Sequence, residues 1–90
     1  MRHNVRFCCD AMTRGVHLGA VRFVAKFREW GIPIPDGGTS FLELMHCPWC
    51  GTVLPASLRD VWFDKAEAMH IDPPYEDMPT EYQSDAWWNR

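Results

Sequence analysis

The sequence predicts a small α+β domain with a three-stranded antiparallel meander, one main helix and a short C-terminal helix. Three observations predict this fold class: the chain has only 90 residues, a Pro-Asp-Gly-Gly turn separates two β-prone runs, and apolar residues follow at helical spacing. A chain of this length forms one domain. We therefore treat 1–90 as a single unit, on which the acidic, Trp-rich segment 72–90 packs.

The first quarter of the chain gives weak signals and one strand. Segment 2–7 can form a short strand. Segment 10–19 shows no clear hydrophobic period, so the sequence predicts neither a helix nor a strand there. Phe23 and Val24 favour a strand over 21–25. Segment 26–29 is then expected to turn the chain.

The clearest local signal is a hairpin with strands over 30–34 and 39–45. Between them, Asp36-Gly37-Gly38 supplies the positive φ values that a tight turn needs. Pro33 has no N–H to donate to a sheet, so we expect the 30–34 strand to lie at an edge. The 39–45 strand leads directly into a cysteine-containing turn.

The second half of the chain predicts a helix over 57–69. Ser57 is a suitable N-cap, and the apolar residues at helical spacing are Leu58, Val61, Trp62, Ala66 and Met69. Pro73-Pro74 ends any continuation. A second short helix is expected over 79–88, where Ser84-Asp85 can cap a separate final turn.

The four cysteines occur as two pairs, Cys8-Cys9 and the pair in Cys47-Pro48-Trp49-Cys50-Gly51. A Cys-x-x-Cys turn places two sulfurs about one tetrahedral edge apart, and Gly51 permits the tight backbone. Because Zn²⁺ prefers four ligands in a tetrahedron, we predict a zinc-ribbon-like domain with a structural Zn²⁺. Its predicted ligands are Cys8, Cys9, Cys47 and Cys50.

The adjacency of Cys8 and Cys9 leaves an alternative open. Neighbouring side chains on a strand point to opposite faces. Both cysteines can reach one ion only if the backbone turns there, for example at the start of a helix. In the alternative ligand set, a histidine replaces one of the two, and the candidates are His46, His17 and His3.

Two other interpretations of the cysteines are less favoured. Cys47 and Cys50 could form a redox pair, but redox Cys-x-x-Cys motifs usually open a helix within a βαβ unit. A structural disulfide requires an oxidising compartment. The sequence shows neither a signal peptide nor a run of ~18 apolar residues, so we expect a cytoplasmic protein that does not contact the membrane.

Taken together, these motifs resemble a family of small, functionally uncharacterised proteins found in bacteria and their phages. The resemblance spans nearly the whole chain and implies a metal-binding α+β domain with four cysteine ligands, without indicating an activity. Two positions depart from the family pattern: Phe7 stands where a histidine often precedes the cysteine pair, and Met69-His70 stands where a glycine often ends the helix. The matching residues are Cys8-Cys9 with Met12, Asp36-Gly37-Gly38, Cys47-Pro48-Trp49-Cys50-Gly51, Leu54-Pro55, Ser57-Leu58-Arg59-Asp60, Trp62-Phe63 and Ser84-Asp85-Ala86-Trp87-Trp88.

No catalytic motif is recognisable in the sequence, and a zinc ion held by four cysteines has no open position for a substrate. We therefore expect a non-enzymatic protein-interaction or regulatory module without a small-molecule substrate. Within this class the resemblance alone suggests an accessory protein of a phage or mobile element that inhibits a host protein. Because Trp87 and Trp88 would point about 100° apart on a helix, we expect one to pack inward. The other should stay exposed beside Tyr82 as a partner-binding surface.

Charge distribution supports a second candidate function. Residues 1–28 contain six basic residues and one acidic residue, whereas residues 60–90 contain eight acidic residues and two basic ones. A basic first third with interleaved aromatic residues is typical of a nucleic-acid-binding zinc ribbon. The acidic remainder favours a protein partner instead. A thiol-redox protein is the third and least favoured class.

Overall fold

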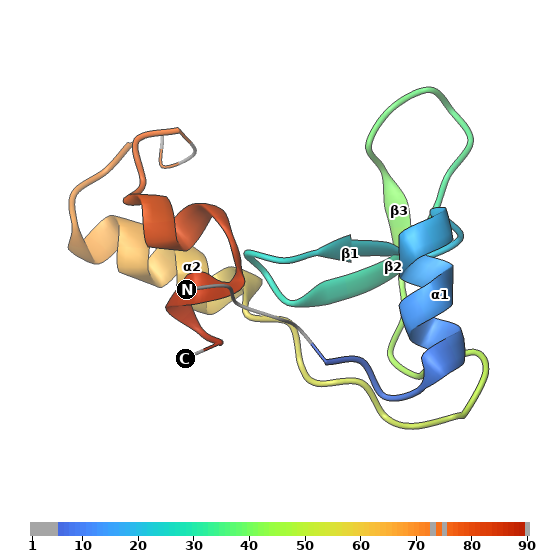
Figure 1. Ribbon diagram of the computed structural model, residues 1–90. Coiled ribbons are helices and arrows are strands. Elements are labelled where there is room, and N and C mark those ends of the chain that lie inside the picture. The colour runs from blue at the N-terminus through green and yellow to red at the C-terminus, as the bar shows by residue number, and fades with distance from the viewer. Residues whose placement is uncertain (1–5, 73, 75, 90) are drawn as a thin grey trace.

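The computed structural model describes residues 6–72, 74 and 76–89. Figure 1 shows a three-stranded sheet with a helix at one end and a second helix, with the C-terminal turns, at the other. The elements in chain order are α1 (Asp10–Leu18), β1 (Arg22–Val24), β2 (Glu29–Pro33), β3 (Phe41–Glu43), α2 (Arg59–Ala68) and two 3₁₀ turns, η1 (Thr80–Gln83) and η2 (Asp85–Trp87). No helix in this described part of the chain is long and apolar enough to cross a membrane.

The predicted antiparallel meander is confirmed, in the order β1-β2-β3. The expectation that the Pro33 strand lies at an edge is wrong, because β2 is central. Trp30 accepts from Leu44 N–H, and Ile34 donates to the Ser40 carbonyl, so these even positions face β3. The backbone of Pro33 faces the side on which β1 lies. Because β1 begins at Arg22, which pairs with Gly31, no residue of β1 lies opposite Pro33. Its missing N–H therefore breaks no ladder hydrogen bond.

The turn between β2 and β3 forms where the sequence predicted it. Gly37 has φ 81°, which a residue with a side chain rarely adopts. The Asp36 carboxylate accepts a hydrogen bond from Gly38 N–H at 2.9 Å. This turn closes the hairpin that leads the chain toward Cys47.

Helix α1 occupies the segment for which the sequence predicted no element. Cys9 is its N-cap, in a position where Ser, Thr, Asp or Asn is usual. Gly19 ends it in the left-handed region with φ 84°. Met12 and Gly15 face inward, but Gly15 carries no side chain, so the apolar period was hidden. Arg6 and Phe7 form no strand, and the rest of the predicted 2–7 strand lies outside the described residues.

The predicted 57–69 helix is present but begins later, at Arg59. Its N-cap is Leu58, without a side-chain hydrogen bond. Ser57 instead donates to a Glu29 carboxylate oxygen at 2.6 Å and accepts from Arg59 N–H at 3.1 Å. Trp62 and Ala66 are buried as predicted, whereas Val61 and Met69 are exposed. His70 follows the helix with φ 58°, the left-handed conformation that glycine holds without strain.

The predicted helix over 79–88 is divided into η1 and η2 at Ser84. Ser84 accepts a hydrogen bond from Ala86 N–H at 3.2 Å, so the expected cap of a separate final turn is confirmed. Trp62 on α2 donates its indole N–H to the Tyr82 carbonyl at 2.7 Å. This bond fixes η1 against the main helix.

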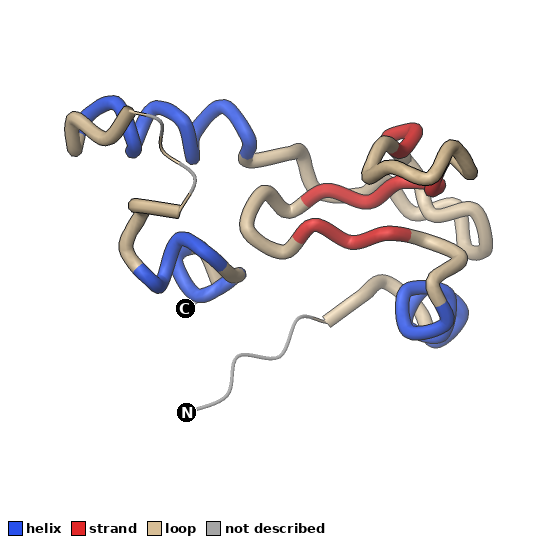
Figure 2. Tube along the Cα trace, turned by 90° about the horizontal axis from the view of Figure 1, so that it is seen from above, coloured by secondary structure: helices blue, strands red, loops and turns tan. Residues whose placement is uncertain are grey.

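The apolar side chains form two separate clusters. The first joins α1, the sheet and the cysteine turn, and its buried residues are Met12, Val21, Trp30, Cys47 and Leu54. The second lies under α2 and the C-terminal turns, and its buried residues are Phe27, Trp62, Ala66, Met78 and Trp87. Figure 2 shows the β1–β2 hairpin extending from one group of elements to the other. Phe23 packs on the first cluster and Phe27 belongs to the second, so the hairpin connects them.

Candidate metal centre

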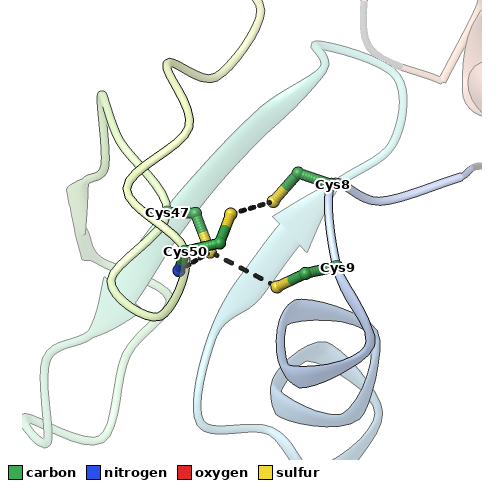
Figure 3. A group of neighbouring side chains, drawn as sticks. All are labelled: Cys8, Cys9, Cys47 and Cys50. Carbon is green, nitrogen blue, oxygen red and sulfur yellow. Dashed lines mark hydrogen bonds between the residues drawn. The ribbon is translucent and has the colours of Figure 1, made fainter.

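The four cysteine thiols converge at the junction of the N-terminal segment and the turn that follows β3 (Figure 3). All four Sγ atoms lie within 4.8 Å of one another. Cys8 Sγ is 3.5 Å from Cys50 Sγ, and Cys9 Sγ is 3.8 Å from Cys47 Sγ. A tetrahedral site with Zn–S bonds of ~2.3 Å has sulfur–sulfur edges of ~3.8 Å. The cluster therefore has the dimensions needed to hold a metal ion.

The Cys47–Cys50 turn aims backbone N–H groups at sulfur. Trp49 N–H and Cys50 N–H both donate to Cys47 Sγ at 3.4 Å. Gly51 has φ 76° and donates to the Cys47 carbonyl at 2.9 Å, which closes the turn. Such N–H···S bonds stabilise a thiolate and orient it toward a metal. Gly51 is thus required for a backbone conformation rather than for space.

Helix α1 explains how two adjacent cysteines reach one site. Cys9 is extended, with φ −158° and ψ 167°, and the chain turns into the helix at Asp10. Met12 N–H donates to Cys9 Sγ at 3.4 Å, so this sulfur caps the helix and faces the cluster at once. The sequence named a helix start as the arrangement that would let both cysteines bind. The structure has that arrangement.

The thiols differ in acidity because they differ in hydrogen bonding. The hydroxyl and backbone N–H of Thr52 lower the pKa of Cys50 to about 6. Desolvation opposes ionisation of Cys47, but the Cys50 and Trp49 N–H groups outweigh it and lower the pKa of Cys47. Desolvation and the neighbouring thiols of Cys47 and Cys50 raise the pKa of Cys8 to about 12. Four thiols this close compete for negative charge, and a bound cation would favour all four thiolates.

The histidines proposed as substitute ligands do not join the cluster. Among the described residues, the group close enough to hold an ion consists of cysteines alone. His46 forms a β-bridge with Val53, and His17 lines a surface groove with Phe7 and Arg14. His3 lies outside the described residues.

The aromatic residues predicted to bind a partner pack against the protein itself. Trp87 is 8% exposed and donates its indole N–H to the Lys26 carbonyl at 2.8 Å. Trp88 is half-buried and donates to the Ala25 carbonyl at 2.7 Å. Both neighbours therefore dock on the β1–β2 turn, and neither is the freely exposed tryptophan that the sequence suggested. Tyr82 stacks on Trp87 with ring centroids 5.4 Å apart.

Trp49 is the exposed tryptophan, and the sequence did not single it out as a surface residue. Its side chain is 49% exposed although the ring contacts Gly15 of α1. Leu18, one helical turn beyond Gly15, is 73% exposed. The available signal was its position, because Trp49 is one of the two residues between the cysteines of the turn.

Three cations of the basic N-terminal third make contacts within the molecule. Arg22 donates to the Thr39 carbonyl at 2.9 Å, and Arg28 donates to the Ala56 carbonyl. Lys26 Nζ lies 5.0 Å from the ring centroids of both Phe27 and Trp62. Arg22 thus contacts the β2–β3 turn, Arg28 the segment before α2, and Lys26 two aromatic rings, so these side chains are less available for phosphate groups than the sequence suggested.

The fold and the cysteine cluster define the class: a small α+β domain whose four thiols, drawn from two distant segments, can hold a metal ion. The chain belongs to the family described as domain of unknown function DUF6980, whose model matches residues 1–90. Neither a curated protein nor a solved structure matches the chain.

Proposed function

We propose that this protein is a non-enzymatic domain that binds one structural Zn²⁺ and acts as a protein-interaction or regulatory module. The observation that carries the proposal is the mutual approach of the Cys8, Cys9, Cys47 and Cys50 Sγ atoms within 4.8 Å. Thiolate ligands select zinc over magnesium or calcium, and four of them in a tetrahedron are typical of structural zinc.

A closed ligand set supports the non-enzymatic part of the proposal. Catalytic zinc keeps one coordination position for water or substrate, whereas four cysteines occupy every position. The metal would instead connect the start of α1 to the turn after β3, and Cys47 already belongs to the first apolar cluster. A chain of 90 residues buries a modest core. Binding free energy from the metal would therefore add directly to folding free energy.

A protein is the better supported partner. Trp49 exposes apolar surface on the cysteine turn, Leu18 is exposed one helical turn beyond Gly15 on α1, and tryptophan is enriched at interaction hot spots. Nucleic-acid binding is less supported because Arg22, Lys26 and Arg28 make internal contacts. An accessory protein that inhibits a host protein belongs to the proposed class, and only the resemblance to phage and bacterial proteins supports that narrower role.

Metal analysis of the purified protein tests the zinc site. We expect one zinc per chain by inductively coupled plasma mass spectrometry, and loss of that zinc in Cys47→Ser. His46→Ala is the matched control, because His46 adjoins Cys47 in sequence without belonging to the cluster. It should keep the zinc. A wild-type protein that is folded and free of metal would refute the proposal.

Two further measurements separate the competing classes. Titration with a short single-stranded oligonucleotide at low and moderate salt should show no binding, because phosphate contacts would give strong affinity at low salt. Binding that weakens steeply with salt would favour the nucleic-acid class. A thiol oxidoreductase should reduce a model disulfide without prior chelation, and we expect no such turnover from the zinc-loaded protein.

A further inference from the structure

The four thiols fall into an inner pair and an outer pair. The inner pair is Cys47, which is 2% exposed, and Cys9, which is half-buried, and both sulfurs accept backbone N–H groups. The outer pair is Cys8 and Cys50, which are both exposed. Their Sγ atoms are 3.5 Å apart, closer than the 3.8 Å between Cys9 Sγ and Cys47 Sγ.

We propose that Cys8 and Cys50 form an oxidation site, at which hydrogen peroxide produces a Cys8–Cys50 disulfide and expels the metal. This inference rests on the proposed zinc binding, since it assigns a second chemical state to the same cluster. Loss of two of four thiolates leaves the ion with an incomplete ligand set. The outer pair is the one that an oxidant in solution reaches first.

The chemistry balances with peroxide as the only co-reactant. One outer thiolate attacks a peroxide oxygen, which breaks the O–O bond and gives a sulfenic acid and hydroxide. The second outer thiolate attacks that sulfur, forms the S–S bond and displaces the oxygen as a second hydroxide. Two sulfurs lose one electron each, two oxygens are reduced, and protons from solvent convert both hydroxides to water.

Exposure and connectivity make this pair different from the others. Cys47 is 2% exposed and its sulfur accepts two N–H···S bonds, so peroxide in solution reaches Cys47 less readily than it reaches the exposed thiols of Cys8 and Cys50. A Cys8–Cys9 bond would join neighbours whose sulfurs already face different partners, Cys50 and Cys47. A Cys8–Cys50 bond spans 42 positions and joins the same two segments that the metal joins.

The consequence is that oxidation and chelation lead to different metal-free proteins. After chelation no cross-link, metal or disulfide, holds the N-terminal end of α1 at the cysteine turn. After oxidation the disulfide keeps the N-terminal segment at the turn and restricts the unfolded chain. The oxidised protein should therefore retain more of the first apolar cluster than the chelated protein does.

The test treats zinc-loaded wild-type protein with one equivalent of hydrogen peroxide. A chromogenic chelator reports released zinc, and remaining thiols are alkylated, then located by tandem mass spectrometry. We expect one zinc released per disulfide, alkyl groups on Cys9 and Cys47, and none on Cys8 and Cys50. Slower hydrogen exchange in α1 of the oxidised protein than of the chelated protein should accompany this result.

Failure of the inference and failure of the zinc proposal give different results. Zinc present at the start but alkyl groups on Cys8 or Cys50 after its release would overturn the oxidation site alone. Sulfinic acid at Cys50 without a disulfide would do the same. Absence of zinc before peroxide is added would refute the proposed function. Because the measurement uses the wild-type chain, it does not depend on a cysteine variant that folds.

Discussion

The indole ring of Trp49 lies against the bare Cα of Gly15. A Cβ at residue 15 would stand 2.9 Å from Trp49 Cζ3 and closer still to Cη2, which is shorter than any ordinary carbon contact. The glycine interrupts the apolar pattern of α1 and so concealed the helix in the sequence. The same absence of a side chain lets the cysteine turn approach the helix that Cys9 caps.

Gly15→Ala should destabilise the protein even though alanine is the better helix former. Alanine gains about 1 kcal/mol of helix propensity over glycine. Overpacking against the indole ring costs about 1–3 kcal/mol. We expect a net loss of about 1 kcal/mol in the free energy of unfolding, measured by chemical denaturation of the zinc-loaded protein.

The control is the same substitution in a Trp49→Ala background. Without the indole ring the three atoms nearest to the new methyl group are absent, and the propensity gain of about 1 kcal/mol should dominate. Gly15→Ala should then stabilise. If it destabilises both backgrounds equally, the Trp49 contact does not explain the requirement for glycine.

Glu29 should make stability depend on pH. Desolvation opposes its ionisation, but hydrogen bonds from Arg59 and Ser57 prevail and lower the pKa of the Glu29 carboxyl. A carboxyl whose folded pKa lies below its unfolded pKa contributes stability above the unfolded value. That contribution is lost as pH falls through the folded value. Glu29→Gln should therefore lower the free energy of unfolding by about 1–2 kcal/mol at pH 7. This value is kept small because the Arg59 side chain is about half exposed and solvent screens the ion pair.

The difference between wild type and Glu29→Gln is the quantity to follow, because acid also protonates the cysteines in both proteins. It should shrink as pH falls below the ordinary carboxyl range. Asp64→Asn, on the exposed face of α2, should change stability little at any pH. A constant difference between pH 7 and strongly acidic pH would contradict the assigned ion pair.

Trp87→Ala should lower stability strongly. Trp87 is 8% exposed, and removing a buried tryptophan leaves a cavity and orphans the Lys26 carbonyl. The expected cost is about 3–5 kcal/mol. Trp49→Ala is the matched comparison, with a smaller effect because that ring is about half exposed. The melting temperature should fall further in Trp87→Ala than in Trp49→Ala. Small and equal decreases in both variants would mean that Trp87 is a surface residue.

His70→Gly should stabilise the protein. His70 has φ 58°, a left-handed conformation that costs a residue with a side chain about 1 kcal/mol relative to glycine. Gly19→Ala provides the opposite change at φ 84° and should destabilise by a similar amount. Denaturation midpoints of the two variants should move in opposite directions, and a parallel movement would argue against the backbone explanation.

Removal of the proposed zinc should loosen one end of the molecule more than the other. Cys47 belongs to the first apolar cluster, whereas the second cluster contains no cysteine. After chelation we expect hydrogen exchange to accelerate most in α1 and in the turn at Cys47, and less in α2. Uniform acceleration across all elements would indicate a single cooperative unit.

Much of the fold was readable from local signals. The Asp36-Gly37-Gly38 turn, the meander and the Trp62 face of α2 each depend on residues close in sequence, where turn chemistry and period act directly. Helix α1 was not readable, because its cap is a cysteine and its central position is a glycine. Pro33 also led to the wrong expectation that its strand lies at an edge. A proline is tolerated in the central strand here because β1 begins only at Arg22, opposite Gly31, and the start of β1 could not be read from Pro33.

The sequence alone favoured four cysteines as candidate metal ligands and left a histidine as the alternative to Cys8 or Cys9. Spacing and residue type singled out four thiols, and a helix start was the stated condition for using both adjacent cysteines. Tertiary structure decided that Trp87 and Trp88 face inward while Trp49 faces solvent. Side-chain chemistry is local, so ligand types can be read from the chain. The exposure of a tryptophan depends instead on contacts with residues far away in sequence. Trp87 and Trp88 pack inward because the Lys26 and Ala25 carbonyls lie within hydrogen-bond distance of their indole N–H groups, and only the folded chain brings these groups together.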